Sequence, residues 1–138
     1  MNATTRWITL AAGLLGLTGV GLGAFGAHAL QELLAASGHL ETWRTAVLYQ
    51  LLHAVALLAL GGLPPSARAG LSPAPGRCRC LSLIAGSWVA GVLLFCGSLY
   101  WLALGGPRWL GPVTPVGGLA FLAGWALVTI QAWQSSAA

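Results

Sequence analysis

Charged residues are scarce in this sequence of 138 residues. It has two acids, Glu32 and Glu41, six arginines and no lysine, so charged residues make up only 6% of the chain. A soluble domain typically carries about 25% charged residues, because its surface faces water. Since 57% of the residues are hydrophobic and the mean hydropathy is +0.82, the apolar surface must face lipid. The composition therefore excludes a soluble globular domain.

Motifs for catalysis and cofactor binding are also missing. The sequence has no Walker loop, dinucleotide fingerprint, nucleophile elbow or zinc-protease motif. Because the chain has only two acids, hydrolysis by a pair of carboxylates is nearly excluded. The net charge of +4 comes from scattered arginines and not from a basic stripe. We therefore expect no catalytic residues, no cofactor and no nucleic-acid partner.

Four long apolar runs predict an all-α protein, an integral membrane four-helix transmembrane bundle. The runs cover approximately residues 8–30, 45–63, 81–104 and 116–133. Each is close to the roughly 17–25 apolar residues that a helix needs to cross the hydrocarbon core. Residues 64–80 are rich in Gly, Pro, Ser and Ala, which is typical of a flexible loop. We predict one transmembrane domain over residues 1–138.

Two shorter features lie around the end of the first run. Gln31–Ala36 is predicted to form a short helix, with Gly38 as its left-handed cap. Ala27-His28-Ala29 has the shape of a signal-peptidase site, but the preceding apolar run is about twice as long as a signal-peptide core of 7–15 residues. We therefore expect an uncleaved first helix.

The distribution of arginines predicts the orientation. Arg6 precedes the first span, and Arg68, Arg77 and Arg79 lie in the second loop. The opposite side has only Arg44 and Arg108, together with both acids. Because cytoplasmic loops carry the excess of Arg and Lys, we predict a multi-pass protein of the cell inner (plasma) membrane with both termini in the cytoplasm.

The first run carries glycines at helical spacing. Residues three and four apart share one face of a helix, and glycines there let a second backbone approach closely in lipid. We predict helix-packing contacts at Gly16, Gly19, Gly23 and Gly26. Packing within one chain is the first interpretation, and self-association through this face is the second.

His53 is the clearest ionisable residue inside a span. It follows Arg44 by nine residues, roughly 13 Å along a helix, which places it near mid-bilayer. Tyr49 and Gln50 precede it by four and three residues and share its face. Polar groups at this depth are costly unless they find partners or serve a function. We expect a neutral, hydrogen-bonded His53; ligand binding, proton transfer, and haem or metal ligation are the alternatives.

Four further polar residues lie at the opposite end of the first span from the N-terminus. His28 and Glu32 are four residues apart, and His39 and Glu41 follow in the connecting segment. Their side chains are acceptable zinc ligands. Their spacing matches no known metal motif, so we predict a solvated polar rim and no metal site.

The three cysteines add no specific site. Cys78 and Cys80 lie beside arginines on the predicted cytoplasmic side, where a structural disulfide is not expected. Thiol reactivity and lipidation remain open there. We interpret Cys96 as a small apolar packing residue.

One segment in each apolar run carries a resemblance to a known family. The segments are Gly23-Ala24-Phe25-Gly26-Ala27-His28, Tyr49-Gln50-Leu51-Leu52-His53-Ala54, Phe95-Cys96-Gly97-Ser98-Leu99-Tyr100, and Thr114-Pro115-Val116-Gly117-Gly118 ahead of Gly124-Trp125. Together they resemble the YgdD/YwdK family of small bacterial inner-membrane proteins, a domain-of-unknown-function family with animal transmembrane-protein relatives.

The resemblance covers nearly the whole chain and implies four transmembrane helices but no activity. The motif residues in which a shared ligand site or polar path is to be sought are His28, Tyr49, Gln50, His53, Ser98, Tyr100 and Thr114. The chain departs from the family at Cys96, where the family resembles Phe-Ser-Gly-Ser-Leu-Tyr, so a role for a hydroxyl there is in doubt. Its second loop is long and rich in Arg and Pro, which indicates a spacer.

Two functional hypotheses follow. In the first, the chain is a structural or accessory membrane subunit that binds a protein partner or lipid through glycine-lined faces. In the second, it is a small oligomeric transporter or channel with a polar path through His28, Gln50 and His53. A single protomer of this size has little room for a pore, so the second needs a homo-oligomer. A haem enzyme is a third and weaker alternative.

Overall fold

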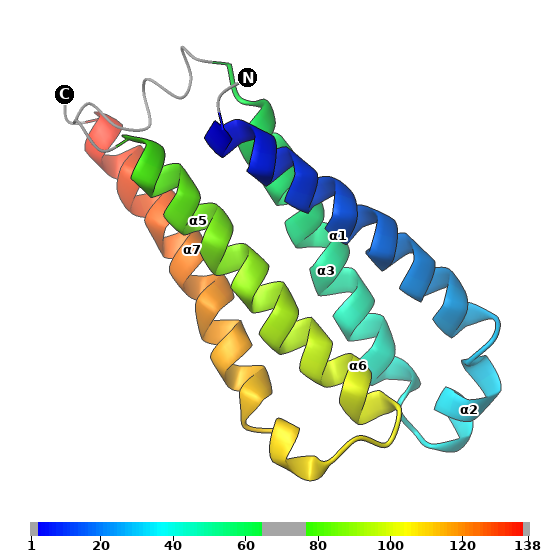
Figure 1. The fold of residues 1–138 in the computed structure, drawn as a ribbon. Coiled ribbons are helices and arrows are strands. Elements are labelled where there is room, and N and C mark those ends of the chain that lie inside the picture. Colours follow the sequence, from blue (N-terminus) through cyan, green and yellow to red (C-terminus); the bar gives the residue numbers. More distant parts are fainter. Residues whose placement is uncertain (1–2, 65–76, 137–138) are drawn as a thin grey trace.

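Long helices build the protein, and none of the residues that the structure describes forms a β-strand. A computed structural model describes residues 3–64 and 77–136. Its long helices are α1 (Ala3–Ala27), α3 (Leu40–Gly62), α5 (Arg77–Gly91) and α7 (Val113–Ser136). A π-helical segment, η1 (Val92–Cys96), continues α5 into α6 (Gly97–Ala103), so α5, η1 and α6 form one rod (Figure 1). The rod and the other three long helices are each long and apolar enough to cross a membrane, which confirms the predicted four-helix bundle.

The helices extend beyond the predicted apolar runs. α1 begins at Ala3 and α3 at Leu40, each about five residues before the predicted span, because a membrane helix can continue into the polar interface. Residues 77–80, predicted as the end of a loop, form the first turn of α5. Arg68 and the remainder of that loop, residues 65–76, lie outside the described residues.

Two glycines in the left-handed region shape the connections between helices. The short helix α2 (Gln31–Ala36) is confirmed, and Gly38 behind it has φ +72°. Gly105 (φ +84°) ends the turn after α6 and leads to the 3-10 helix η2 (Arg108–Leu110). Positive φ is easy only for glycine. Pro115 lies in the first turn of α7, where a missing N–H costs nothing, so α7 begins three residues earlier than predicted.

The long helices alternate in direction, so α1 begins and α7 ends at the same end of the bundle (Figure 1). α3 and the α5–η1–α6 rod are the more buried pair, whereas α1 and α7 are peripheral. α1 packs mainly on α3, and α7 packs mainly on α5 and η1. The core between them contains Ile8, Leu57, Ile84, Trp88 and Phe121.

The glycines spaced along one face of α1, the glycine stripe, have two kinds of surroundings. A Cβ on Gly19 would lie 2.8 Å from Leu51 Cδ2, one on Gly23 would lie 3.2 Å from Val47 Cγ1, and one on Gly26 would overlap the Trp43 indole. These three glycines therefore face α3 at close range. Gly16 has open space in front of it, because nothing lies within 4 Å of its Cβ position. The stripe turns away from α3 towards its N-terminal end.

Candidate functional site

Gln50 joins three helices at the centre of the bundle. Its Nε2 donates to the Leu15 carbonyl (2.9 Å) and to Thr18 Oγ1 (2.8 Å), both on α1. Its Oε1 accepts from the Tyr100 hydroxyl on α6 (2.9 Å). The amide uses both of its N–H donors and its acceptor, and the residue is buried. We call Thr18, Gln50 and Tyr100 the Gln50 network.

His53 lies one turn from Gln50 on α3 but turns towards α7. Its Nδ1 is 2.8 Å from the Tyr49 carbonyl, and Trp125 Nε1 lies 3.2 Å from its Nε2. A carbonyl only accepts and an indole N–H only donates. Nδ1 therefore carries the proton and Nε2 accepts from Trp125, so the imidazole is neutral. A metal or haem iron at Nε2 would have to displace the hydrogen bond from Trp125.

Aromatic rings enclose His53. The Phe121 ring stacks on the imidazole with centroids 3.8 Å apart, and Trp88 meets the imidazole edge-on at 6.0 Å. Tyr49 extends the cluster to Phe95, with ring centroids 4.9 Å apart. We call this group the aromatic cluster; its members are Tyr49, His53, Trp88, Phe95, Phe121 and Trp125. It covers the buried His53 on the side of α5 and α7.

Glycine on α7 makes room for the cluster. Trp88 is buried, and a Cβ on Gly124 would overlap its indole. The Trp88 N–H has no hydrogen-bond acceptor within the described residues. Trp125 follows at the next position and packs on Trp88 at a tilt of 48°, with ring centroids 4.7 Å apart. The Gly124-Trp125 motif therefore fits one indole against the helix backbone and directs the other towards His53.

The residues that follow the π-helical segment η1 face two different helices. Ser98 Oγ donates to the Phe95 carbonyl (3.0 Å) and lies 2.7 Å from Thr114 Oγ1 at the start of α7. Tyr100 is two residues further, about 200° around a helix, and so faces α3. Ser98 and Tyr100 therefore let one rod contact two different neighbours, α7 and α3.

A glycine also allows η1 to approach α7. A Cβ on Gly117 would lie 2.7 Å from Phe95 Cα and 2.8 Å from Phe95 Cβ. This is contact between two helix backbones, which a side chain would prevent. Gly118 lacks this restriction, since its Cβ position is 3.9 Å from the nearest atom, Phe95 Cδ2.

The residues at the α2 end of the bundle are separate from these groups. His28 is exposed in the turn behind α1, ten residues or about 15 Å along the chain axis from Thr18. The structure therefore brings Gln50, Tyr100, Ser98, Thr114, Tyr49 and His53 close together in the bundle and leaves His28 outside. Within residues 3–64 and 77–136, no three His, Cys, Asp or Glu side chains gather in a way that would hold a metal ion.

Several contributors were not singled out from the sequence. Thr18, Trp125, Phe121 and Trp88 complete the two polar and aromatic groups. Trp43 lies near the predicted interface but is buried, and its Nε1 donates to the Leu22 carbonyl at 3.0 Å. The Gly124-Trp125 motif is a sequence signal for Trp125, but it does not specify the partner of the indole. Cys96 is buried, as a packing residue should be.

Comparisons with known proteins confirm the family resemblance of the chain. The family model described as "Protein of unknown function (DUF423)" matches residues 22–118. The chain is similar to UPF0382 membrane protein YwdK of Bacillus subtilis, with 36% identity over 118 residues, 84% of this chain and 87% of YwdK.

Two further relatives extend the comparison. A UPF0382 membrane protein of Haemophilus influenzae is 37% identical over 132 residues, 94% of this chain and 95% of that protein. UPF0382 membrane protein C1782.12c of Schizosaccharomyces pombe is 36% identical over 124 residues, 86% of this chain and 95% of that protein. No solved structure matches the chain. The chain belongs to the DUF423 family, whose relatives named here are UPF0382 membrane proteins.

Proposed function

We propose that this protein is a structural or accessory membrane subunit that binds a lipid or a partner helix with its lipid-facing surface. The observation that carries the proposal is the engagement of Gln50 between helices. Both amide protons are donated to α1 and the amide oxygen accepts from Tyr100, so the buried amide holds the bundle together and keeps no free donor for a passing solute.

The state of His53 supports the same conclusion. Both of its ring nitrogens are engaged, and the aromatic cluster packs against it. A proton relay needs a nitrogen that can exchange partners with water or with another titratable group. The nearest ring partners of His53 are Phe121, Trp88, Trp125 and Tyr49. This arrangement therefore argues against the alternative function, a transporter or channel.

The lipid-facing surface of α1 supports binding outside the bundle. Leu17 is 73% exposed, Leu14 is 61% exposed, and Gly13 and Gly16 have open space in front of them. Open glycines between exposed leucines favour contact with another membrane component, such as a second copy or a partner helix.

We also infer an orientation. α1 and α5 begin, and α7 ends, at the same end of the bundle. Arg6, Arg77 and Arg79 lie in the sequence at this end, whereas Arg44 and Arg108 lie at the other end. The excess of arginine favours the cytoplasm for the first end, in an inner or plasma membrane.

A flux measurement separates the accessory function from transport. Purified protein is reconstituted into liposomes that hold a potassium and proton gradient. We expect the gradients to decay no faster than in empty liposomes, because Gln50 and His53 are bonded to neighbouring helices. A faster decay that His53→Leu or Gln50→Leu abolishes would overturn the proposal.

A photo-crosslinking experiment tests the binding surface. A photoreactive residue at Leu17 on α1 is compared with one at Leu122 on α7, which is 65% exposed. We expect a defined crosslinked species from Leu17 in native membranes and only diffuse lipid adducts from Leu122. Equal, diffuse labelling at both positions would contradict binding through α1.

A further inference from the structure

A groove runs along the surface between α1 and α3 at the α2 end of the bundle. It has a volume of about 340 Å³. One wall is formed by Gly23 and Ala27 of α1 and the other by Val47, Leu48 and Leu51 of α3. The absent side chain at Gly23 opens the groove on the α1 side. Its middle is therefore apolar and open to the lipid.

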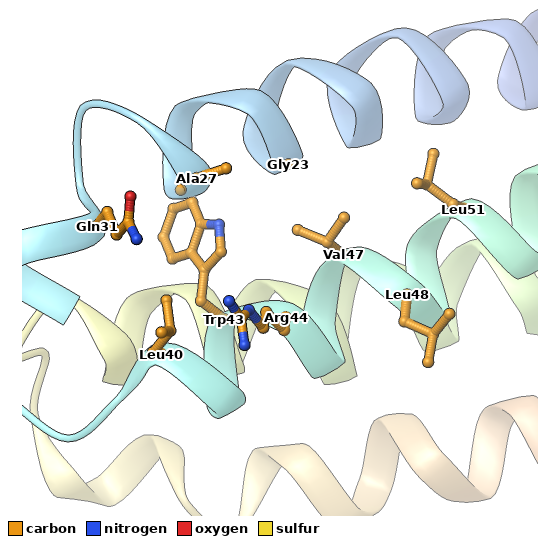
Figure 2. A pocket seen from close by; sticks show the side chains of 10 residues that line it. Gly23, Ala27, Gln31, Leu40, Trp43, Arg44, Val47, Leu48 and Leu51 are labelled. Carbon is orange, nitrogen blue, oxygen red and sulfur yellow. The ribbon is translucent and has the colours of Figure 1, made fainter. Parts of the chain in front are cut away.

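The end of the groove nearest α2 is polar. Gln31 and Arg44 line it, on either side of the buried Trp43 (Figure 2). Arg44 Nη1 donates to Glu41 Oε1 at 2.8 Å, and both side chains are largely exposed. A guanidinium has five N–H donors, so donors remain for a second acceptor. The polar end thus offers a cation, an amide and, next to them, a carboxylate.

The groove matches the depth profile of a bilayer leaflet. Leu51 is the middle residue of α3, and Arg44 precedes it by seven residues, about 10 Å along the helix. The hydrocarbon core of one leaflet is about 15 Å thick. With Leu51 at mid-bilayer, the long Arg44 side chain reaches the interface, where lipid phosphates lie, and the apolar part of the groove runs inwards along the acyl chains.

We propose that this groove binds one phospholipid, with its phosphate on Arg44 and Gln31 and one acyl chain between Ala27, Val47 and Leu51. The Glu41–Arg44 pair is complementary to a zwitterionic headgroup, because the phosphate faces a cation and the ammonium an anion. The inference deepens the proposed function by naming a lipid as the bound component, and it rests on that function.

The charged end of the groove favours a lipid over an apolar partner helix. Arg44 keeps N–H donors beyond the one bonded to Glu41, and a lipid headgroup brings a phosphate to the same depth. The apolar face of a membrane-spanning partner helix would leave these donors without an acceptor.

Native mass spectrometry of the full chain in detergent tests the proposal, with dioleoylphosphatidylethanolamine as the probe. We expect one lipid per protein, and Arg44→Gln should weaken binding about tenfold or more, because a charge-assisted hydrogen bond is lost. Arg108→Gln is the matched control, since Arg108 is exposed at the same end but outside the groove. Dioleoylglycerol lacks the phosphate. Its binding to the wild type should therefore be as weak as the binding of the phospholipid to Arg44→Gln.

A second pair of variants tests the chain-binding part. Ala27→Leu fills the groove, whereas Ala24→Leu adds the same side chain to an exposed position of α1 outside it. We expect only Ala27→Leu to lower phospholipid binding, with both variants melting at the wild-type temperature. The proposal would be overturned if Arg44→Gln and Arg108→Gln, or Ala27→Leu and Ala24→Leu, lowered phospholipid binding equally. It would also be overturned if dioleoylglycerol bound tightly, or if the protein formed a dimer that Ala27→Leu abolished. Lipid binding with a His53-dependent flux would refute the accessory function and leave the lipid site standing.

Discussion

At the scale of single residues, the polar side chains inside the bundle are connectors between helices. Gln50 reaches α1 through the Leu15 carbonyl and Thr18, and it reaches α6 through Tyr100. In a membrane such hydrogen bonds contribute about 0.6 kcal/mol on average and up to about 1.7 kcal/mol each. Several of them on one amide make Gln50 the residue on which the relative position of three helices depends.

A double-mutant cycle measures this connection. Tyr100→Phe removes one hydrogen bond, and Gln50→Leu removes all three, so we expect losses of about 1 kcal/mol and about 1–3 kcal/mol in the free energy of unfolding. The double variant should lose about 0.6–1.7 kcal/mol less than the sum of the two. Strictly additive losses would mean that the Tyr100 hydroxyl and the Gln50 amide do not interact.

The hydrogen bonds of His53 predict its tautomer. With Tyr49 as acceptor and Trp125 as donor, the neutral ring carries its proton on Nδ1. ¹⁵N spectra of histidine-labelled protein at pH 7 should show this form for the resonance that His53→Gln removes. In the Trp125→Phe variant that resonance should shift, because Nε2 loses its donor. An imidazolium signal, or a proton on Nε2, would contradict the arrangement.

At the scale of elements, the third membrane-crossing rod is the most informative, because η1 interrupts its α-helical register. The apolar run over residues 81–104 predicted a rod here, but a π-helical turn has no hydrophobic signature of its own. It lies where α7 approaches the rod closely, at Gly117. This contact cannot be predicted from either segment alone.

Two adjacent glycines provide a test of that contact. Gly117→Ala places a Cβ against the Phe95 backbone, where neither helix can yield easily, and we expect a loss of about 2 kcal/mol or more in stability. Gly118→Ala meets only an ordinary contact and should be neutral or stabilise the helix by up to about 1 kcal/mol. Thermal unfolding in detergent distinguishes them. A Gly117→Ala variant as stable as Gly118→Ala would rule out the backbone contact.

At the scale of the whole molecule, composition and the lengths of the apolar runs were sufficient to predict four membrane-crossing helices. Lipid leaves a chain this apolar few other ways to satisfy its backbone. The glycine stripe of α1 lies close to α3 at Gly19, Gly23 and Gly26. It did not indicate that Gly16 faces away, since the crossing of two helices limits how far along a stripe they touch.

The hydrogen-bond partners of the polar residues could not be predicted from the sequence either. Tyr49, Gln50 and His53 were expected to share one face of α3, yet Gln50 bonds to α1 and α6 whereas His53 bonds to α7. Three residues along a helix differ by about 60° from a full turn, which is enough to reach a different neighbour once the bundle is assembled.

The orientation of the whole molecule is tested with single cysteines. In a chain whose three native cysteines are replaced by serine, Ser37→Cys marks the α2 end and Ala138→Cys marks the C-terminus. We expect an impermeant maleimide to label only Ser37→Cys in intact cells, and Ala138→Cys only after the membrane is permeabilised, because of the arginine excess. The opposite pattern would invert the proposed topology.

The central claim is that Gln50 and His53 hold a dry bundle together and do not line a path for water. Solid-state NMR of the ¹⁵N-labelled protein in liposomes measures it most directly, as magnetisation transfer from water protons to the Gln50 amide and the His53 ring N–H. We expect no transfer to either group at mixing times that give strong transfer to exposed residues such as Gln31. Strong transfer to Gln50 or His53 would show a water-filled path and contradict the account.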